Sequence, residues 1–241
     1  MNQRISRRKV LWFMLTSIVG SIALALSSNA RLRRYIDQAT IHLSLKPPAP
    51  MPPVVSRIEW GAREPDHTAP NEFGFAENAI SPEWYIYQQD LAVVYNTIAI
   101  HHSASLLASN ETMKDIQDLH MDRNGWADVG YHFGIDQYGV IFAGRDINVR
   151  GASVAGYNTG TIGIVVMGNF ETDKPLEVQL TTLQSLINAL TVRYNLTHLA
   201  GHGEFNPESV CPGRNLIPYL DQLAQAASLE RGTSGHIPPT L

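Results

Sequence analysis

The sequence contains a single cysteine, Cys211, in 241 residues, so no disulfide can form within the chain. It has no excess of positive charge, because 18 basic residues stand against 22 acidic ones and give a formal net charge of −4. No basic stripe occurs in the later sequence, which argues against a nucleic-acid partner. No internal repeat and no HExxH motif are present, so we expect neither a repeat architecture nor the common zinc-peptidase helix.

Hydrophobic residues make up 44% of the sequence, which is enough for a packed core, and the length suits one domain with extensions. The stretch KPPAPMPP at residues 46–53 is too rich in proline for a helix or a central strand. We therefore expect a spacer at 31–53, which begins with a short helix at 31–45. A folded domain at 54–226 and a flexible tail at 227–241 complete the predicted organisation.

Residues 1–30 have the pattern of a signal peptide. Four basic residues occupy the first nine positions, an uncharged run extends from Val10 to Leu26, and small residues follow. The Arg7–Arg8 pair resembles a twin-arginine signal, which would export an already folded, metal-loaded protein. The alternatives are an ordinary secretory signal and an uncleaved membrane anchor, because the run approaches the roughly 17–25 residues that span a bilayer.

Four short runs rich in β-branched or aromatic residues, each bounded by turn residues, predict strands. They are residues 97–101, 131–135, 140–143 and 161–167. The second and third runs are separated by a loop that ends at Gly139, which predicts a hairpin.

Two stretches predict helices. After Pro175, apolar residues recur every three or four positions from Leu176 to Tyr194. A second helix is expected from Glu111 to about Arg123, with Asn110 as its N-cap. The predicted fold class is α/β, a single domain with a central mixed β-sheet flanked by helices.

The residues best suited to chemistry are two histidines and the cysteine. His101 ends the first predicted strand, and His202 and Cys211 flank a loop about a hundred residues later. Two imidazoles and a thiolate suit zinc, and three protein ligands leave the fourth position open, as in catalytic sites. The alternative from spacing alone is that Cys211 is a small buried hydrophobic residue and that the histidines satisfy ordinary hydrogen bonds.

Neighbouring polar residues have plainer interpretations. His102 and His132 are expected to point to the opposite faces of their strands, where they either support the neighbouring site residues or act in packing. Glu204 is the carboxylate nearest in sequence to His202 and either orients that imidazole or is solvated in the loop.

Five segments, in order along the chain, resemble one protein family. They are RIEWGAR at 57–63, IAIHHSA at 98–104, GWADVGYHFGIDQYGVIFAGRD at 125–146, GYNTGTIGIVVMGNF at 156–170 and GHGEFNPESVCPG at 201–213. On these segments the sequence resembles the peptidoglycan-recognition proteins and the amidase-type bacteriophage lysozymes. The resemblance covers nearly the whole predicted domain.

The resemblance implies a zinc-dependent hydrolase, an N-acetylmuramoyl-L-alanine amidase that cleaves the amide bond between N-acetylmuramic acid and L-alanine in peptidoglycan. It implies that His101, His202 and Cys211 bind one Zn²⁺ and that Tyr131 is catalytic. In such a site zinc makes hydroxide available near neutral pH. Tyr131 would donate a hydrogen bond to the developing oxyanion or relay a proton to the leaving amine. The implied setting is the periplasm or cell envelope of a bacterium, with a membrane tether if the anchor is retained.

Further positions follow from the same resemblance. Ser209 stands where the family carries lysine or threonine, so it is expected as a second hydrogen-bond donor without a positive charge. His120 and Asn158 match residues that hold the stem peptide. The loop between His202 and Cys211 has eight residues, one more than in the phage and animal enzymes.

A recognition module that binds peptidoglycan without cutting it is the alternative function. Members of that kind have lost the cysteine ligand, so the presence of Cys211 and Tyr131 favours activity. The expected partner is peptidoglycan or a muropeptide, and no feature of the sequence indicates an oligomeric state.

Overall fold

The computed structural model describes residues 50–69 and 84–236. The chain divides between Pro47 and Pro48, and all described residues belong to the second unit. The predicted signal at 1–30, the predicted helix at 31–45 and the chain end at 237–241 lie outside the described residues. Within the described ranges, no helix is long and apolar enough to cross a bilayer.

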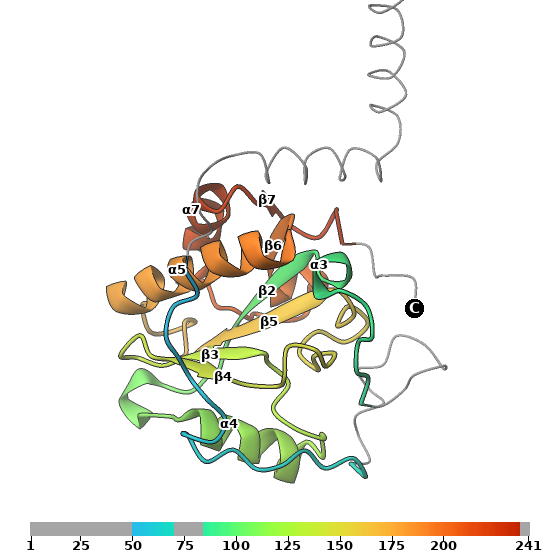
Figure 1. Ribbon diagram of the computed structural model, residues 1–241. Coiled ribbons are helices and arrows are strands. Elements are labelled where there is room, and N and C mark those ends of the chain that lie inside the picture. Colours follow the sequence, from blue (N-terminus) through green and yellow to red (C-terminus); the bar gives the residue numbers. More distant parts are fainter. Residues whose placement is uncertain (1–49, 70–83, 237–241) are drawn as a thin grey trace, which may run out of the picture. The chain divides into compact units, whose positions relative to one another are not determined.

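A mixed sheet of seven strands lies at the centre of this unit (Figure 1), in the order β1-β4-β3-β5-β2-β6-β7. Only β3 and β4 pair in antiparallel fashion, and the other neighbours are parallel. The predicted mixed sheet and its hairpin are therefore confirmed. The strands are β1 (Val54–Val55), β2 (Thr97–His102), β3 (Phe133–Ile135), β4 (Ile141–Ala143), β5 (Thr161–Val166), β6 (His198–Gly201) and β7 (Glu230–Arg231).

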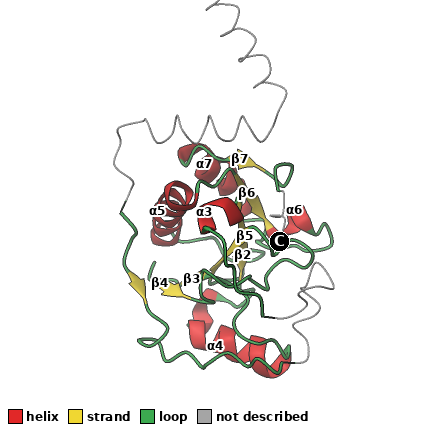
Figure 2. Ribbon diagram, turned by 45° about the vertical axis from the view of Figure 1, so that its right-hand side comes forward, coloured by secondary structure: helices red, strands yellow, loops and turns green. Residues whose placement is uncertain are grey.

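Helices cover both faces of the sheet (Figures 1 and 2), with α5 and α7 on one face and α4 on the other. Alternating side chains of β2 explain the two layers, because Ile98 and Ile100 join the large core cluster with α5 while Ala99 and His101 face the other way. The helices are α3 (Leu91–Val94), η2 (Leu107–Ser109), α4 (Met113–Asp118), η3 (Leu119–Arg123), α5 (Glu177–Tyr194), α6 (His202–Phe205) and α7 (Ile217–Ala226).

Helix α5 packs the apolar stripe that its sequence predicts. Leu183, Ile187 and Leu190 are fully buried in the core, and the helix ends where Asn195 adopts the left-handed conformation. Leu176, expected on the buried stripe, is 41% exposed because it precedes the first helical residue.

Helix α4 begins later than predicted. Thr112, rather than Asn110, is the N-cap: its hydroxyl accepts a hydrogen bond from Asp115 N–H, and the Asp115 carboxylate accepts one from Thr112 N–H. Asn110 lies outside the helix with a left-handed backbone. The last turn, η3, widens into a π-turn, a local form that occurs frequently at functional sites.

The first described segment is attached to the sheet by side-chain contacts, and the last by pairing of its backbone with β6. Trp60 Nε1 donates to the Ala143 carbonyl, and Arg57 pairs with the buried Asp128 at 2.9 Å. At the other edge, Glu230 and Arg231, which belong to the segment predicted as a flexible tail, form β7 in parallel with β6. A strand of two residues is too short for its alternation to be recognised in a sequence.

Candidate metal centre

The candidate site lies on the face of the sheet opposite α5. Small residues of the three central strands, Ala99, Gly163 and Ala200, share this face, as the parallel register pairs Ala99 with both others. A Cβ atom at Gly163 would lie 2.6 Å from the Ser153 hydroxyl, so the floor of the site has no room for a larger side chain there. His101 is two residues after Ala99 and therefore projects on the same side.

Three potential ligands meet above this floor. His101, His202 and Cys211 each offer one ligand atom, a ring nitrogen or the sulfur, and these three atoms lie within 4.8 Å of one another. His101 Nδ1 lies 3.7 Å from Cys211 Sγ, near the roughly 3.5 Å expected for tetrahedral zinc bonded to one nitrogen and one sulfur. The two imidazole ring centres are 4.8 Å apart. The sequence-predicted triad is thus brought together.

Local backbone contacts hold the two later ligands near each other. His202 opens α6 directly after β6, and Gly203 N–H donates to the Cys211 carbonyl at 2.7 Å. A Cβ atom at Gly203 would lie 2.6 Å from the Ser209 carbonyl oxygen, so the loop closes only over a glycine. The GHGEF pattern by itself does not indicate a role for this glycine, and the close approach of the two backbone segments explains it.

Burial sets the protonation of the three groups. It lowers the pKa of His101 well below its ordinary value, with smaller contributions from neighbouring histidines, and it also lowers the pKa of His202. Both imidazoles are therefore neutral at pH 7 and keep a lone pair for a metal. Burial raises the pKa of the Cys211 thiol to about 12, although the backbone N–H of His102 donates to Sγ at 3.3 Å and opposes the rise.

The residues fit a zinc ion. His101 Nδ1 faces Cys211 Sγ at 3.7 Å and belongs to a ring that burial keeps neutral, so this nitrogen has a lone pair for the ion. Two neutral imidazoles and one thiol make a borderline-soft donor set, which suits zinc better than calcium or magnesium.

Tyr131 lies beside the triad. Its ring centre is 4.9 Å from that of His101, and it precedes β3 rather than lying inside the strand as predicted. Burial, followed by the charges of Cys211 and Glu111, raises the pKa of Tyr131 above its ordinary value. The phenol therefore keeps its proton at neutral pH and can donate a hydrogen bond.

His120 continues the row of rings. Its ring centre is 5.4 Å from that of Tyr131 and 4.5 Å from the Trp126 ring. Burial lowers the pKa of His120 to about 3, so the ring is neutral. Its Nδ1 accepts a hydrogen bond from Gly130 N–H at 2.9 Å, which puts the ring proton on Nε2.

Asn158 and Ser209 both contact the backbone of their own loops. Asn158 is 1% exposed, and its Oδ1 accepts hydrogen bonds from Ser153 N–H and Val154 N–H. The Ser209 hydroxyl oxygen accepts from Cys211 N–H at 3.3 Å, so its own proton is available to another acceptor.

Three polar residues near the site, His102, His132 and Glu204, form hydrogen bonds with backbone groups. His102 Nδ1 accepts from Phe170 N–H, and His132 contacts Tyr95 and accepts from Gly163 N–H, so both rings form hydrogen bonds with neighbouring segments of the fold. Among the described residues, the Glu204 carboxylate accepts a hydrogen bond from Gly201 N–H at 2.6 Å rather than contacting the His202 ring.

Comparisons with known proteins agree on one family. A family model described as N-acetylmuramoyl-L-alanine amidase matches residues 91–214, which include all three residues of the triad. Peptidoglycan-recognition protein SC2 of Drosophila simulans is 32% identical over 171 residues, covering 68% of this chain and 82% of that protein.

Two solved structures are also similar to this chain. The endolysin N-acetylmuramoyl-L-alanine amidase LysCS from Clostridium intestinale URNW has a TM-score of 0.55 and 25% identity, over 76% of this chain and 99% of that one. Human PGRP-IBETAC, solved in complex with glycosamyl muramyl pentapeptide, has a TM-score of 0.57 and 27% identity, over 74% and 99%.

Proposed function

Because this chain belongs to the N-acetylmuramoyl-L-alanine amidase family, we propose that it is a zinc-dependent amidase that cleaves peptidoglycan between N-acetylmuramic acid and L-alanine. The observation that carries this proposal is the meeting of His101, His202 and Cys211, with the Tyr131 ring beside them. In this assignment the three side chains would hold the ion next to the reacting groups.

The chemistry that zinc supplies in such a site is Lewis-acid activation of water and of the amide carbonyl at neutral pH. Hydrolysis joins a hydroxyl to the lactyl carbonyl carbon and breaks its bond to nitrogen, and the amine of L-alanine leaves with the remaining proton. The protein must therefore stabilise negative charge on the carbonyl oxygen and protonate the leaving nitrogen.

We assign the first of these tasks to Tyr131. Its phenol is neutral at pH 7, so its O–H can donate to the oxyanion in a site where burial strengthens the hydrogen bond. Ser209 supplies a second O–H donor from the loop between the two later ligands.

Binding of the stem peptide is assigned to the row of rings and the loop beside it. His120 offers its Nε2–H to a peptide carbonyl, because Gly130 N–H already occupies Nδ1. Asn158 shapes the loop at residues 153–158 through its two backbone hydrogen bonds. The solved complex of human PGRP-IBETAC with a muramyl pentapeptide supports a ligand of this class.

The family acts on peptidoglycan, which supports a cell-wall-related or secreted protein. We propose that the chain is exported to the periplasm or envelope through residues 1–30, with retention of that segment as the route to a membrane tether. The catalytic domain proposed for residues 54–226 would follow the proline-rich spacer.

The test is digestion of purified sacculi by the zinc-loaded full-length protein, followed by mass spectrometry. We expect released stem peptides that begin with a free L-alanine amine. Cys211→Ala and His202→Ala should each abolish both release and stoichiometric zinc binding. His67→Ala is the matched control, because His67 is exposed and far along the chain from the triad.

Two results would count against the proposal. Intact lactyl amides after incubation with zinc-replete protein that still sediments with sacculi would favour the recognition module instead. Release of stem peptides by the Cys211→Ala variant at the wild-type rate would remove the assigned metal ligand from the mechanism.

A further inference from the structure

Arg231, in the C-terminal strand β7, joins three elements through one guanidinium group. Its Nη1 lies 2.8 Å from Glu204 Oε2 and donates to the Leu199 carbonyl at 2.7 Å, while Nε donates to Asp221 at 2.9 Å. These contacts reach α6, β6 and α7. We call Arg231, Glu204, Asp221 and the Leu199 carbonyl the Arg231 clamp.

The clamp acts on the turn that carries His202. The Glu204 oxygen that contacts Arg231, Oε2, also accepts from Gly201 N–H at 2.6 Å. Gly201 is the residue immediately before His202, so a single carboxylate oxygen ties the start of α6 to the C-terminal strand. Arg231 therefore fixes the position of the group that anchors this turn.

Helix α6 needs such support, because it has only four residues, from His202 to Phe205. A single turn fixes several backbone angles for very few hydrogen bonds and is unstable by itself. His101, by contrast, is 1% exposed in a central strand. Of the two histidines of the triad, His202 is therefore the one whose orientation depends on local contacts.

Within the clamp, the contact of Arg231 with Glu204 is less exposed to solvent than its contact with Asp221. The side chain of Arg231 is 23% exposed and that of Glu204 is 37% exposed, whereas Asp221 is 83% exposed. An exposed pair contributes little, so Asp221 adds less than Glu204 and the Leu199 carbonyl. A pocket of about 460 Å³ lies on this side of the loop and is lined by Glu204, Arg231 and Cys211 among others.

We propose that Arg231 is a positioning residue for the metal centre: through Glu204 it fixes the backbone at Gly201 and thereby the orientation of the His202 imidazole. Arg231 lies outside residues 91–214, the region matched by the family model, and the proposal therefore rests on the contacts of this chain alone. The inference rests on the zinc site of the proposed function.

The experiment compares zinc affinity, measured by competition with a chelator, in the full-length wild type and in Arg231→Ala. We expect about 10-fold weaker zinc binding in the variant, as for other residues that orient metal ligands. Glu204→Ala should give a similar loss, and the double variant should be no weaker than either single one, because both remove the same support. Asp221→Asn should stay within about twofold of the wild type.

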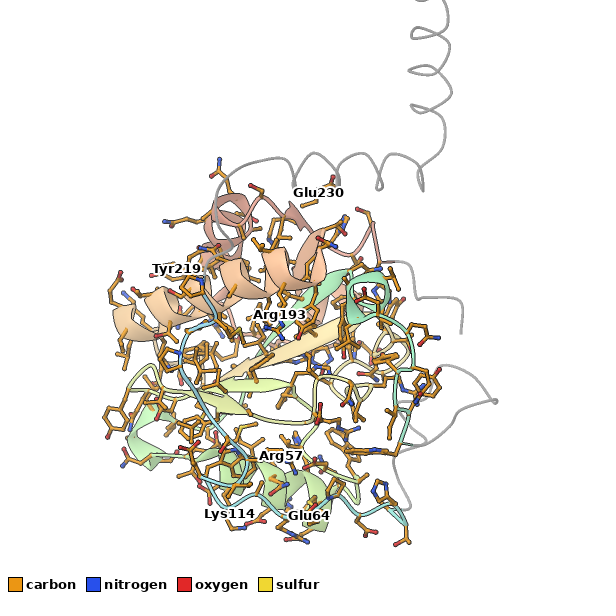
Figure 3. All side chains as sticks on the ribbon, viewed as in Figure 1. Arg57, Glu64, Lys114, Arg193, Tyr219 and Glu230 are labelled. Carbon is orange, nitrogen blue, oxygen red and sulfur yellow. The ribbon has the colours of Figure 1, made fainter. Side chains whose placement is uncertain are left out.

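Two further measurements separate positioning from general stability. The visible spectrum of the Co²⁺-loaded protein reports ligand geometry, and it should change in Arg231→Ala. Lys114→Ala is the control, because it also removes a surface ion pair, at 3.0 Å with Asp118. Lys114 lies on α4, at the opposite end of this unit from Glu230 of β7 (Figure 3), and its removal should leave both zinc affinity and spectrum unchanged.

Each outcome decides the inference. If Arg231→Ala keeps the zinc affinity and the Co²⁺ spectrum of the wild type, the positioning role of Arg231 is wrong, even if thermal stability falls. The proposed function is not affected by that result. A wild type that binds no zinc would overturn the proposed function as well. If Arg231→Ala does not fold, Arg231→Lys takes its place: one ammonium cannot reach all three oxygens, and we expect a loss of a few-fold.

Discussion

Burial acts in opposite directions on the pKa values of the histidines and the cysteine of the metal centre, and both directions matter for a metal. It lowers the pKa of His101 and keeps that ring neutral, so its lone pair is available. It raises the pKa of the Cys211 thiol to about 12, so the sulfur holds its proton until a cation replaces it. Zinc uptake near neutral pH should therefore release one proton.

Tyr131 is the residue for which metal binding and turnover can be separated. In Tyr131→Phe the ring keeps its contact with His101, but the O–H donor is lost. We expect about 10²-fold slower release of stem peptides, the typical cost of removing one donor to an oxyanion. Zinc affinity should be unchanged, as measured by chelator competition beside the digestion rate. Tyr138→Phe, at a tyrosine that is 70% exposed, is the matched control.

Either of two results would contradict this role. Turnover at the wild-type rate would show that the phenol proton is not used. A parallel loss of zinc affinity and turnover would show that Tyr131 acts through the geometry of the ligands rather than on the substrate.

At the scale of elements, the turn from β6 into α6 brings the two later ligands together, and Gly203 is its tightest point. In Gly203→Ala the new Cβ would lie 2.6 Å from the Ser209 carbonyl and 3.0 Å from that of Cys211, so the loop must open. We expect at least 10-fold weaker zinc binding and a loss of about 1–3 kcal/mol in the free energy of unfolding. Zinc titration and urea unfolding measure these two effects.

The control for this variant is Glu208→Ala in the same loop, since the Glu208 side chain is exposed. It should keep the zinc affinity of the wild type. If Gly203→Ala also keeps it, the approach of the two backbone segments is not what brings His202 and Cys211 together.

The strands and helices that the sequence predicts are those with a pattern several residues long. β2, β5 and α5 have such patterns, and their positions agree with the prediction within a few residues. The N-cap at Thr112 was missed because Asn110, an equally good capping residue, lies two positions earlier. Arg231 and Gly203 could not be assigned from the sequence, because their roles depend on contacts between segments that only the folded chain brings together.

At the scale of the whole molecule, the strand order explains how ligands from distant segments converge. β2 lies between β5 and β6, and both pairs are parallel, so residues at the carboxyl ends of β2 and β6 become neighbours. The register pairs Ile100 with Gly201, and the residue that follows each of them in the chain is a histidine of the triad. The order of the sheet, which the sequence does not specify by pattern, thus decides where the candidate site lies.

The same burial that serves the metal centre makes the zinc-free protein sensitive to acid. Burial lowers the pKa of His132 to about 4 and that of His120 to about 3. Burial also lowers the pKa of His236, in the C-terminal segment, to about 4, with a smaller contribution from the nearby His198. The unfolded chain has ordinary histidines with pKa values near 6.5. Between pH 6.5 and about 4 the unfolded state therefore binds more protons than the folded state, and stability falls as pH falls.

This window can be separated from acid effects of carboxylates, whose ordinary pKa values lie near 4. We expect the free energy of unfolding of the zinc-free protein, measured in urea with a chelator present, to decrease from pH 7.5 to pH 5. His132 alone should account for about 2 kcal/mol of the decrease, because at pH 5 it is mostly neutral in the folded protein and mostly protonated in the unfolded chain. In His132→Gln, which does not titrate, the decrease should be smaller by that amount. A free energy of unfolding that stays constant or rises as the pH is lowered over this range would show that the buried histidines do not remain neutral.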